Sequence, residues 1–332
     1  MLKYYMILTG AVTLTVASIS AFAAGSFCML PASPSGSAYI NLYNDGRVIP
    51  PLAGPPVSSL LSRTNFGIDL PNGGSAGVCQ ISGLANNSTA PLPGYGLQVT
   101  ANTQNIYAVD GTTIIGGVTE RIWRKTSTSP AMCILGTSVA LTSNAYYNGS
   151  RYFELNDIAR GGFANVGAVN VGYFTVPTTP ALYPVYRAGR TFTSVQHRAY
   201  KYDGFQAEKQ NNGIGYLDLP TIGGSSTLNI NGVNVGILGN TVASASATQQ
   251  QAQVNTNWVD FTLHAVFLDG DITDPISAMT YIEFPCNNDS AAVINTAWRK
   301  SGALRLRQTG QKNSTFHEII MTGYAPPGAI LP

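Results

Sequence analysis

The chain has 332 residues, of which 44% are hydrophobic and only 10% are charged, and its formal net charge is +2. Soluble domains usually carry about 25% charged residues, so the surface must rely on Ser, Thr, Asn, Gln and Tyr, as in extracellular β-proteins and assembling subunits. The small net charge excludes nucleic acid as an electrostatically bound partner.

The N-terminal residues have the features of a secretory signal peptide. Lys3 precedes an apolar run from Tyr5 to Ala17, and Ala21-Phe22-Ala23 fits the small-x-small pattern of a cleavage site. The run is shorter than the ~20 apolar residues of a transmembrane helix. We therefore expect residues 1–24 to be removed, no membrane span in the mature chain, and a protein that is secreted or held at the cell surface.

Short β-type segments separated by turn signals follow. Asn or Asp before Gly is the strongest local hairpin signal, because the turn needs positive φ. It occurs at Asp110-Gly111, between Ile106–Val109 and Thr112–Ile115, and at Asn231-Gly232, between Leu228–Ile230 and Val233–Val235. Further hairpins are expected around Asn44-Asp45-Gly46 and Asn148-Gly149. Asn156–Arg160 predicts one helical turn, since Asn156 or Asp157 could cap it.

The stretch Asn257–Cys286 has the clearest strand pattern. Apolar residues at alternate positions from Val259 to Phe267 are typical of a strand with one face in a core. A second arm, Met279–Phe284, follows an acidic turn. We expect the central hairpin of a sandwich, with Phe261 in the core and Thr262 on a solvent-exposed face.

These patterns predict an all-β fold, an antiparallel β-sandwich or jelly roll. The signal peptide, residues 1–24, is followed either by one sandwich or by two packed β-domains. If there is a boundary, it lies at Thr126–Pro130 and separates an N-terminal β-region, residues 25–129, from a C-terminal sandwich region, residues 130–332.

Four cysteines, Cys28, Cys79, Cys133 and Cys286, occur in this chain. An even number in an exported protein predicts two disulfides, and the lack of a Cys-x-x-Cys spacing disfavours zinc or redox chemistry. Of the three connectivities we prefer Cys28–Cys79 with Cys133–Cys286, because each bridge then stays within one half of the chain.

Two groups of residues are candidate sites. Asp269, Asp271 and Asp274 place three carboxylates in one turn, where calcium could bind; a solvated turn without a metal is favoured, and no cofactor is expected. Arginines and aromatic residues concentrate between Arg160 and Tyr202 and could bind a glycan or a protein. The candidate binding residues are Arg160, Tyr186, Arg187, Arg190 and Arg198. The alternative is that the aromatic residues are core and the arginines are spaced solvent contacts.

Catalysis is not indicated by a motif. The three histidines, His197, His264 and His317, lie in no His-Glu-x-x-His pattern, and there is no Gly-x-Ser-x-Gly. Paired carboxylates for glycoside hydrolysis are set by the fold, and none of the eligible residues is singled out: Glu120, Glu154, Asp157, Asp218 and Glu283.

We therefore expect a non-enzymatic exported component with a structural, adhesive or binding role. Its partner would be a glycan or another surface protein, and the sequence is also compatible with self-assembly. The alternatives are a secreted carbohydrate-active enzyme with a jelly-roll core and a subunit of a surface filament or coat.

Overall fold

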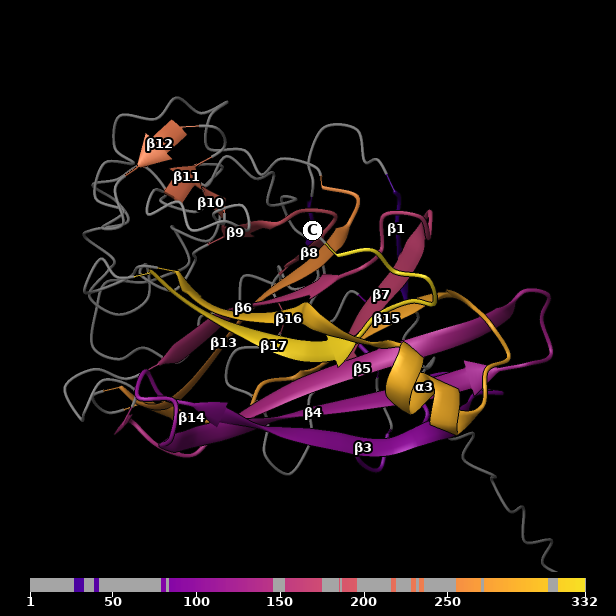
Figure 1. The fold of residues 1–332 in the computed structure, drawn as a ribbon, viewed down its shortest axis with the longest axis horizontal. Coiled ribbons are helices and arrows are strands. Elements are labelled where there is room, and N and C mark those ends of the chain that lie inside the picture. Colours follow the sequence, from indigo (N-terminus) through magenta and orange to yellow (C-terminus); the bar gives the residue numbers. More distant parts are fainter. Residues whose placement is uncertain are drawn as a thin grey trace, which may run out of the picture.

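The computed structural model describes residues 27–32, 39–41, 79–81, 84–145, 153–174, 185, 187–195, 216–218, 228–230, 233–235, 255–269, 272–309 and 316–331. In this part of the chain the regular structure consists of β-strands and one short helix, and two large antiparallel sheets pack face to face (Figure 1). The predicted all-β sandwich is confirmed. No helix of the described part is long and apolar enough to cross a membrane.

The first large sheet has six strands. In spatial order they are β1 (Cys28–Leu30), β7 (Val169–Phe174), β15 (Met279–Cys286), β5 (Ala131–Leu141), β4 (Ile114–Lys125) and β3 (Gly96–Tyr107). β4 and β5 pair from Gly116 with Leu141 to Lys125 with Met132. The segment Thr126–Pro130 is the connection between these neighbouring strands, so both predicted regions contribute to one sheet.

The second large sheet has seven strands. Its path is β17 (Phe316–Tyr324), β16 (Arg299–Thr309), β6 (Glu154–Gly161), β13 (Trp258–Asp269), β8 (Arg187–Gly189) and β2 (Tyr39–Asn41), and β14 (Ile272–Asp274) pairs with β13. A small third sheet, in the order β12 (Val233–Val235), β11 (Leu228–Ile230), β10 (Tyr216–Asp218) and β9 (Thr193–Val195), lies at the periphery in Figure 1.

The core lies between the two large sheets. Val118 and Ile122 of β4 pack in the same cluster as Ile158 of β6, Phe261 of β13 and Leu306 of β16, all with no exposed surface. Apolar side chains at alternate positions of facing strands therefore form the interior, as the period-2 pattern requires.

The hairpins predicted at Asp110-Gly111 and Asn231-Gly232 are confirmed, because the strands that flank each turn pair antiparallel. β3 pairs with β4 up to Tyr107 and Ile114, and β11 pairs with β12. In the β3–β4 turn, Asp110 Oδ1 accepts hydrogen bonds from the backbone N–H groups of Thr112 and Thr113, both at 2.8 Å. The hairpins expected around Asn44 and Asn148 have their turns outside the described residues.

The predicted central hairpin Asn257–Cys286 is wrong, because its two long arms lie in different sheets. β13 pairs with β6 and β8, whereas β15 pairs with β5 and β7. β14 folds back on β13, with Asp274 opposite Val266. Pro275 then leads the chain across to the other sheet, where its carbonyl accepts a hydrogen bond from Leu141 at 2.8 Å. Alternation reports which side chains share a face, but it does not identify the neighbouring strand.

Two further expectations are also wrong. Thr262 has no exposed surface, although its face of β13 was expected to be wet. Asn156–Arg160 is part of strand β6 rather than a helical turn. β6 pairs with β13 on one side and β16 on the other and is buried along its whole length, so tertiary pairing overrides the local capping signal.

Both disulfides have the preferred connectivity. Cys28 is bonded to Cys79, with a Cα–Cα distance of 5.3 Å, and Cys133 is bonded to Cys286, with a distance of 5.8 Å. The second bridge joins the neighbouring strands β5 and β15 near the point where Cys133 pairs with Phe284. No cysteine remains free.

The outer face of the six-stranded sheet carries a second apolar cluster. Trp123 and Tyr281 lie there edge to face, with ring centroids 5.9 Å apart, and Leu84, Leu92 and Tyr95 pack over the cluster. A Cβ on Gly136 would lie 2.7 Å from the Trp123 ring. The sheet is therefore buried on both faces in this region.

The helix and the C-terminal tail close the end of the sandwich. Helix α3 (Ala291–Ala297) is capped by Ser290, whose side chain accepts a hydrogen bond from the N–H of Val293. The tail after β17 passes over the end of β6, where Cβ atoms on Gly161 and Gly162 would lie 2.6 Å from Leu331 and 2.7 Å from Ala329. The glycine pair thus leaves room for the tail.

Candidate functional site

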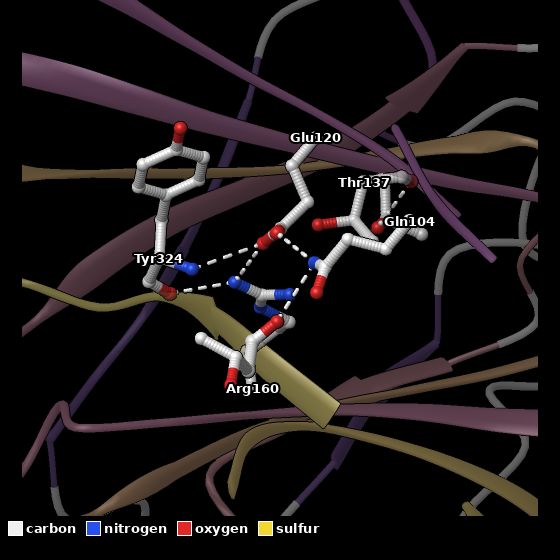
Figure 2. Close-up of polar contacts among 7 residues, drawn as sticks. Gln104, Glu120, Thr137, Arg160 and Tyr324 are labelled. Carbon is white, nitrogen blue, oxygen red and sulfur yellow. Dashed lines mark hydrogen bonds and ion pairs between the residues drawn. The ribbon is translucent and has the colours of Figure 1, made fainter. Parts of the chain in front are cut away.

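A charged pair lies inside the sandwich, between the two sheets. Glu120 projects from β4 and Arg160 from β6, and Arg160 Nη2 lies 2.6 Å from Glu120 Oε1 with both side chains fully buried (Figure 2). Arg160 Nη2 also donates to the carbonyl of Tyr324 at 2.6 Å. Arg160, one of the predicted binding residues, thus has its charge neutralised inside the core, where it links the two sheets.

The same carboxylate holds the two strands that border one side of the sandwich. Glu120 Oε1 accepts from the N–H of Tyr324 at 3.1 Å, and Glu120 Oε2 accepts from Gln104 Nε2 at 3.2 Å. Gln104 Nε2 also donates to the carbonyl of Thr322 at 2.8 Å. These contacts connect β3 to β17, and together with Arg160 they occupy backbone groups of β17 between Thr322 and Tyr324 (Figure 2).

The outer face of the seven-stranded sheet carries two adjacent aromatic rings with an arginine at each end. The Arg307 guanidinium lies 4.7 Å from the Phe192 ring centroid, Phe192 lies 4.1 Å from Trp258, and Arg305 lies 5.7 Å from Trp258. Arg307 Nε also approaches Asp157 Oδ1 at 3.3 Å, with both side chains fully buried. Cation–π contacts and a buried ion pair stabilise this face, and Asp157 of β6 and Trp258 of β13 are buried on it.

Of the other predicted binding residues, the structure describes the side chain of Arg190 and the backbone of Arg187. Arg190 has no exposed surface and donates to the carbonyls of Phe163, at 3.1 Å, and Thr256. Burial lowers the pKa of the Arg190 guanidinium to about 10. Arg187 pairs through its backbone with Thr262 in β13. Tyr186 and Arg198 lie outside the described residues.

The acidic turn is described only in part. Asp269 ends β13 and pairs with Ile272, and Asp274 ends β14, whereas Asp271 lies outside the described residues. Within the described ranges, no group of three or more His, Cys, Asp or Glu residues is placed to hold a metal ion.

The carboxylates that were eligible for acid–base chemistry form internal bonds wherever their side chains are described. Glu120 and Asp157 belong to the two buried ion pairs, and Glu154 accepts from Asn156 Nδ2 at 2.6 Å. Glu283 accepts from the Tyr95 hydroxyl and from Asn170 Nδ2, the latter at 2.5 Å. Burial, followed by the hydrogen bond and charge of Glu283, raises the pKa of Tyr95.

An exposed candidate surface lies along β3, at the border of the six-stranded sheet opposite β1. β3 is the terminal strand of that sheet and, among the described strands, pairs only with β4. Tyr107, at the end of β3, is 43% exposed, and Val109 and Ile114, in and beyond the following turn, are 57% and 48% exposed. We call this strand border, together with these three side chains, the β3 edge.

Sequence reasoning identified the β3–β4 hairpin but not its exposed border. A signal was present, since the 12 residues of β3, GLQVTANTQNIY, include no charged residue and no proline. Both residue types are common on protected edge strands.

Comparisons with protein-family models, with curated proteins and with solved structures find no match to this chain.

Proposed function

We propose that this protein is an exported, non-enzymatic component of the cell surface or extracellular space that acts by associating with another protein. The observation that carries the proposal is the β3 edge, a long neutral strand border with exposed apolar side chains at one end. Such a border presents unpaired backbone N–H and C=O groups to which a further strand can add. Of the two expected partner classes, glycan and surface protein, the β3 edge supports the protein.

The two disulfides support the proposed compartment. Bridges persist in oxidising environments outside the cytoplasm, and here they fix β1 to the loop at Cys79 and β5 to β15. The N-terminal signal pattern of residues 1–24 agrees with the same route.

The internal use of carboxylates supports a non-enzymatic role. A glycosidase needs two carboxyl groups flanking the scissile bond, whereas Glu120, Asp157, Glu154 and Glu283 are engaged by arginine, amide or hydroxyl groups of the scaffold. Moving Glu120 or Asp157 toward a substrate would leave a fully buried arginine without its counter-charge, and moving Glu154 or Glu283 would break a hydrogen bond within the scaffold.

Antibody labelling of intact, unpermeabilised cells and of the culture medium tests the proposal. We expect the protein in one of these fractions, with all four cysteines protected from alkylation until a reductant is added. Detection only inside cells, with alkylated thiols, would overturn the exported role. Release of reducing ends from a polysaccharide panel, abolished by Glu283→Gln, would overturn the non-enzymatic role.

A further inference from the structure

Two short segments together cover the border of the six-stranded sheet at β7. Strand β1 pairs antiparallel with residues 169–171 of β7. Residues 79–81 run parallel beside Tyr173, whose N–H donates to the carbonyl of Cys79 at 3.1 Å and whose carbonyl accepts from the N–H of Ile81 at 2.8 Å. We call residues 27–30 and 79–81 the β7 strap. The strap satisfies backbone groups of β7 that would otherwise lack a partner in the sheet.

The strap lies close against β7 because residue 172 has no side chain. A Cβ on Gly172 would lie 2.5 Å from the Phe27 ring and 2.9 Å from the carbonyl oxygen of Cys79. Phe27 also stacks on Tyr281, with ring centroids 5.7 Å apart, and Leu30 is buried in the core. Both pieces of the strap are therefore held by packing as well as by backbone hydrogen bonds.

The two disulfides hold different parts of the sheet. Cys28–Cys79 joins the two pieces of the strap, which are 51 positions apart in sequence. Cys133–Cys286 joins β5 to β15, which pair at every position from Thr280 with Thr137 to Cys286 with Ala131. Loss of the second bridge would leave a continuous strand pair. Loss of the first would restore chain entropy to two short pieces, which favours their detachment.

The first bridge is also the more accessible of the two. Cys28 is partly exposed, whereas Cys133 and Cys286 are 0% and 7% exposed. Cys79 has a φ of 59°, the one positive value among the described residues other than glycine. This left-handed conformation is unfavourable for a residue with a Cβ. Accessible and strained bridges are reduced before shielded ones, so a reductant should open Cys28–Cys79 first.

We propose that the Cys28–Cys79 bridge is a redox latch: reduction by a dithiol detaches the β7 strap and opens the border of the six-stranded sheet, and oxidation closes it. A thiolate of the dithiol attacks Cys28 Sγ, and the Cys79 thiolate leaves. The second thiolate of the dithiol then displaces Cys28, so the dithiol becomes a disulfide and its two protons end on the two cysteines. The latch goes beyond the proposed function and does not involve the β3 edge.

Graded reduction of the purified, oxidised full chain with dithiothreitol tests the order in which the bridges open. Alkylation and peptide mapping should label Cys28 and Cys79 at a dithiothreitol concentration at least tenfold lower than the concentration that labels Cys133 and Cys286. Reduction of both bridges together, or of Cys133–Cys286 first, would overturn the proposal.

Hydrogen exchange tests whether the strap detaches. The Tyr173 amide, which donates to Cys79, should exchange at least tenfold faster in the selectively reduced protein, while the amides of β5 keep their rates. Slow exchange at Tyr173 should return after oxidation with glutathione disulfide. Unchanged exchange on reduction, or fast exchange that persists after oxidation, would contradict the latch.

Cysteine variants separate the latch from a general effect of the reductant. Replacing Cys28 and Cys79 with Ser should give fast exchange at Tyr173 without a dithiol, whereas replacing Cys133 and Cys286 with Ser should leave it slow. The opposite pattern would count against the assignment. Reduction of the unsubstituted protein decides the question independently if a variant fails to fold.

A glycine variant tests the contact between the strap and β7 while both bridges are intact. Gly172→Ala places a methyl group against Phe27 and the Cys79 carbonyl, so it should speed reduction of Cys28–Cys79 by at least threefold. Gly117→Ala, whose Cβ would meet nothing closer than 3.5 Å, should leave the rate unchanged. Equal rates in the two variants would show that the strap does not lie on β7.

Discussion

Arg160 and Glu120 form an ion pair of 2.6 Å between the two sheets, and neither side chain is exposed. The pair is 40 positions apart in sequence. Taking both charges out of water carries a large desolvation cost, which is offset by the hydrogen bonds from Tyr324 and Gln104 to the carboxylate and from Arg160 to the Tyr324 carbonyl. The pair therefore fixes how β4, β6 and β17 are stacked.

The first prediction concerns this ion pair. Arg160→Met should lower the free energy of unfolding by about 3–5 kcal/mol, because it leaves a buried carboxylate without its counter-charge. Glu120→Gln should also lower the free energy of unfolding, since it leaves the Arg160 guanidinium without a negative counter-charge. The double variant should lose clearly less free energy of unfolding than the two single variants lose together, as measured by urea denaturation in a double-mutant cycle. Strictly additive losses would mean that the two charges do not interact.

The second prediction uses two glycines in neighbouring strands. A Cβ on Gly136 would lie 2.7 Å from the Trp123 ring, whereas one on Gly117 would meet nothing closer than 3.5 Å. Gly136→Ala should therefore cost about 1–3 kcal/mol through overpacking, and Gly117→Ala should be close to neutral. Thermal unfolding of both variants, with Trp fluorescence as a second readout, compares them. A larger loss for Gly117→Ala would contradict the packing of Trp123.

The third prediction compares the two disulfides. The bridges span sequence separations of 51 and 153 residues, for which loop-closure entropy gives about 4 and about 5 kcal/mol. Replacing Cys133 and Cys286 with Ala should therefore destabilise the protein by about 1 kcal/mol more than replacing Cys28 and Cys79. Guanidinium unfolding of the two double variants measures this difference. The reverse order would show that strain or residual structure, rather than chain entropy, dominates.

The fourth prediction concerns pH and the β3–β4 turn. Hydrogen bonds from the Thr113 side chain and from the Thr113 and Thr112 backbone lower the pKa of Asp110 to about 2. A carboxyl with a depressed folded-state pKa stabilises the protein above its unfolded pKa, near 3.8, and this contribution is lost as pH falls toward 2. Asp110→Ala should thus lower Tm at pH 7, and the difference from the unsubstituted protein should shrink between pH 4 and about pH 2.

Asp110→Asn is the control for this titration. The substitution keeps an Oδ1 acceptor for the turn but removes the ionisable group. The variant should therefore retain most of the turn's hydrogen bonds, and its Tm should lose the pH dependence that comes from Asp110. A Tm difference between Asp110→Ala and the unsubstituted protein that stays constant down to pH 2 would argue against a titrating Asp110.

The fifth prediction concerns the two faces of β13. Phe261 and Thr262 are both fully buried, so Phe261→Ala should cost about 3–5 kcal/mol and Thr262→Ala about 1–2 kcal/mol through lost packing and hydrogen bonding. Chemical denaturation of both variants gives the comparison. A neutral Thr262→Ala would indicate that this face is open to water in solution.

Local signals in the sequence predicted the parts of the fold that local chemistry determines. Asp110-Gly111 identified its hairpin because the turn bonds are made within three residues. The partner of β13 was not predictable in the same way, because apolar alternation is satisfied by any neighbouring strand and Pro275 redirects the chain to the other sheet. The helical turn expected at Asn156 failed for a related reason, since pairing with β13 and β16 outweighs a cap.

The candidate sites show the same limit. An arginine has the same local signature whether it binds a ligand or a buried carboxylate, and only the stacking of the sheets brings Arg160 to Glu120. The neutral composition of β3 was visible in the sequence, but it became informative only when the strand order placed β3 at a border.

The hydrogen bonds that Gln104 and Glu120 make with β17 also constrain when the chain can complete its fold during biosynthesis. Gln104 and Glu120 find partners at Thr322 and Tyr324, which lie 218 and 204 positions later in the chain. A ribosome makes these partners long after Gln104 and Glu120, so the nascent chain carries the Glu120 carboxylate before its hydrogen-bond partner on β17 exists. A truncated product that ends before β17 would keep this charge without part of its hydrogen bonding and should be more susceptible to proteolysis, so stable assembly of the two sheets depends on the synthesis of β17.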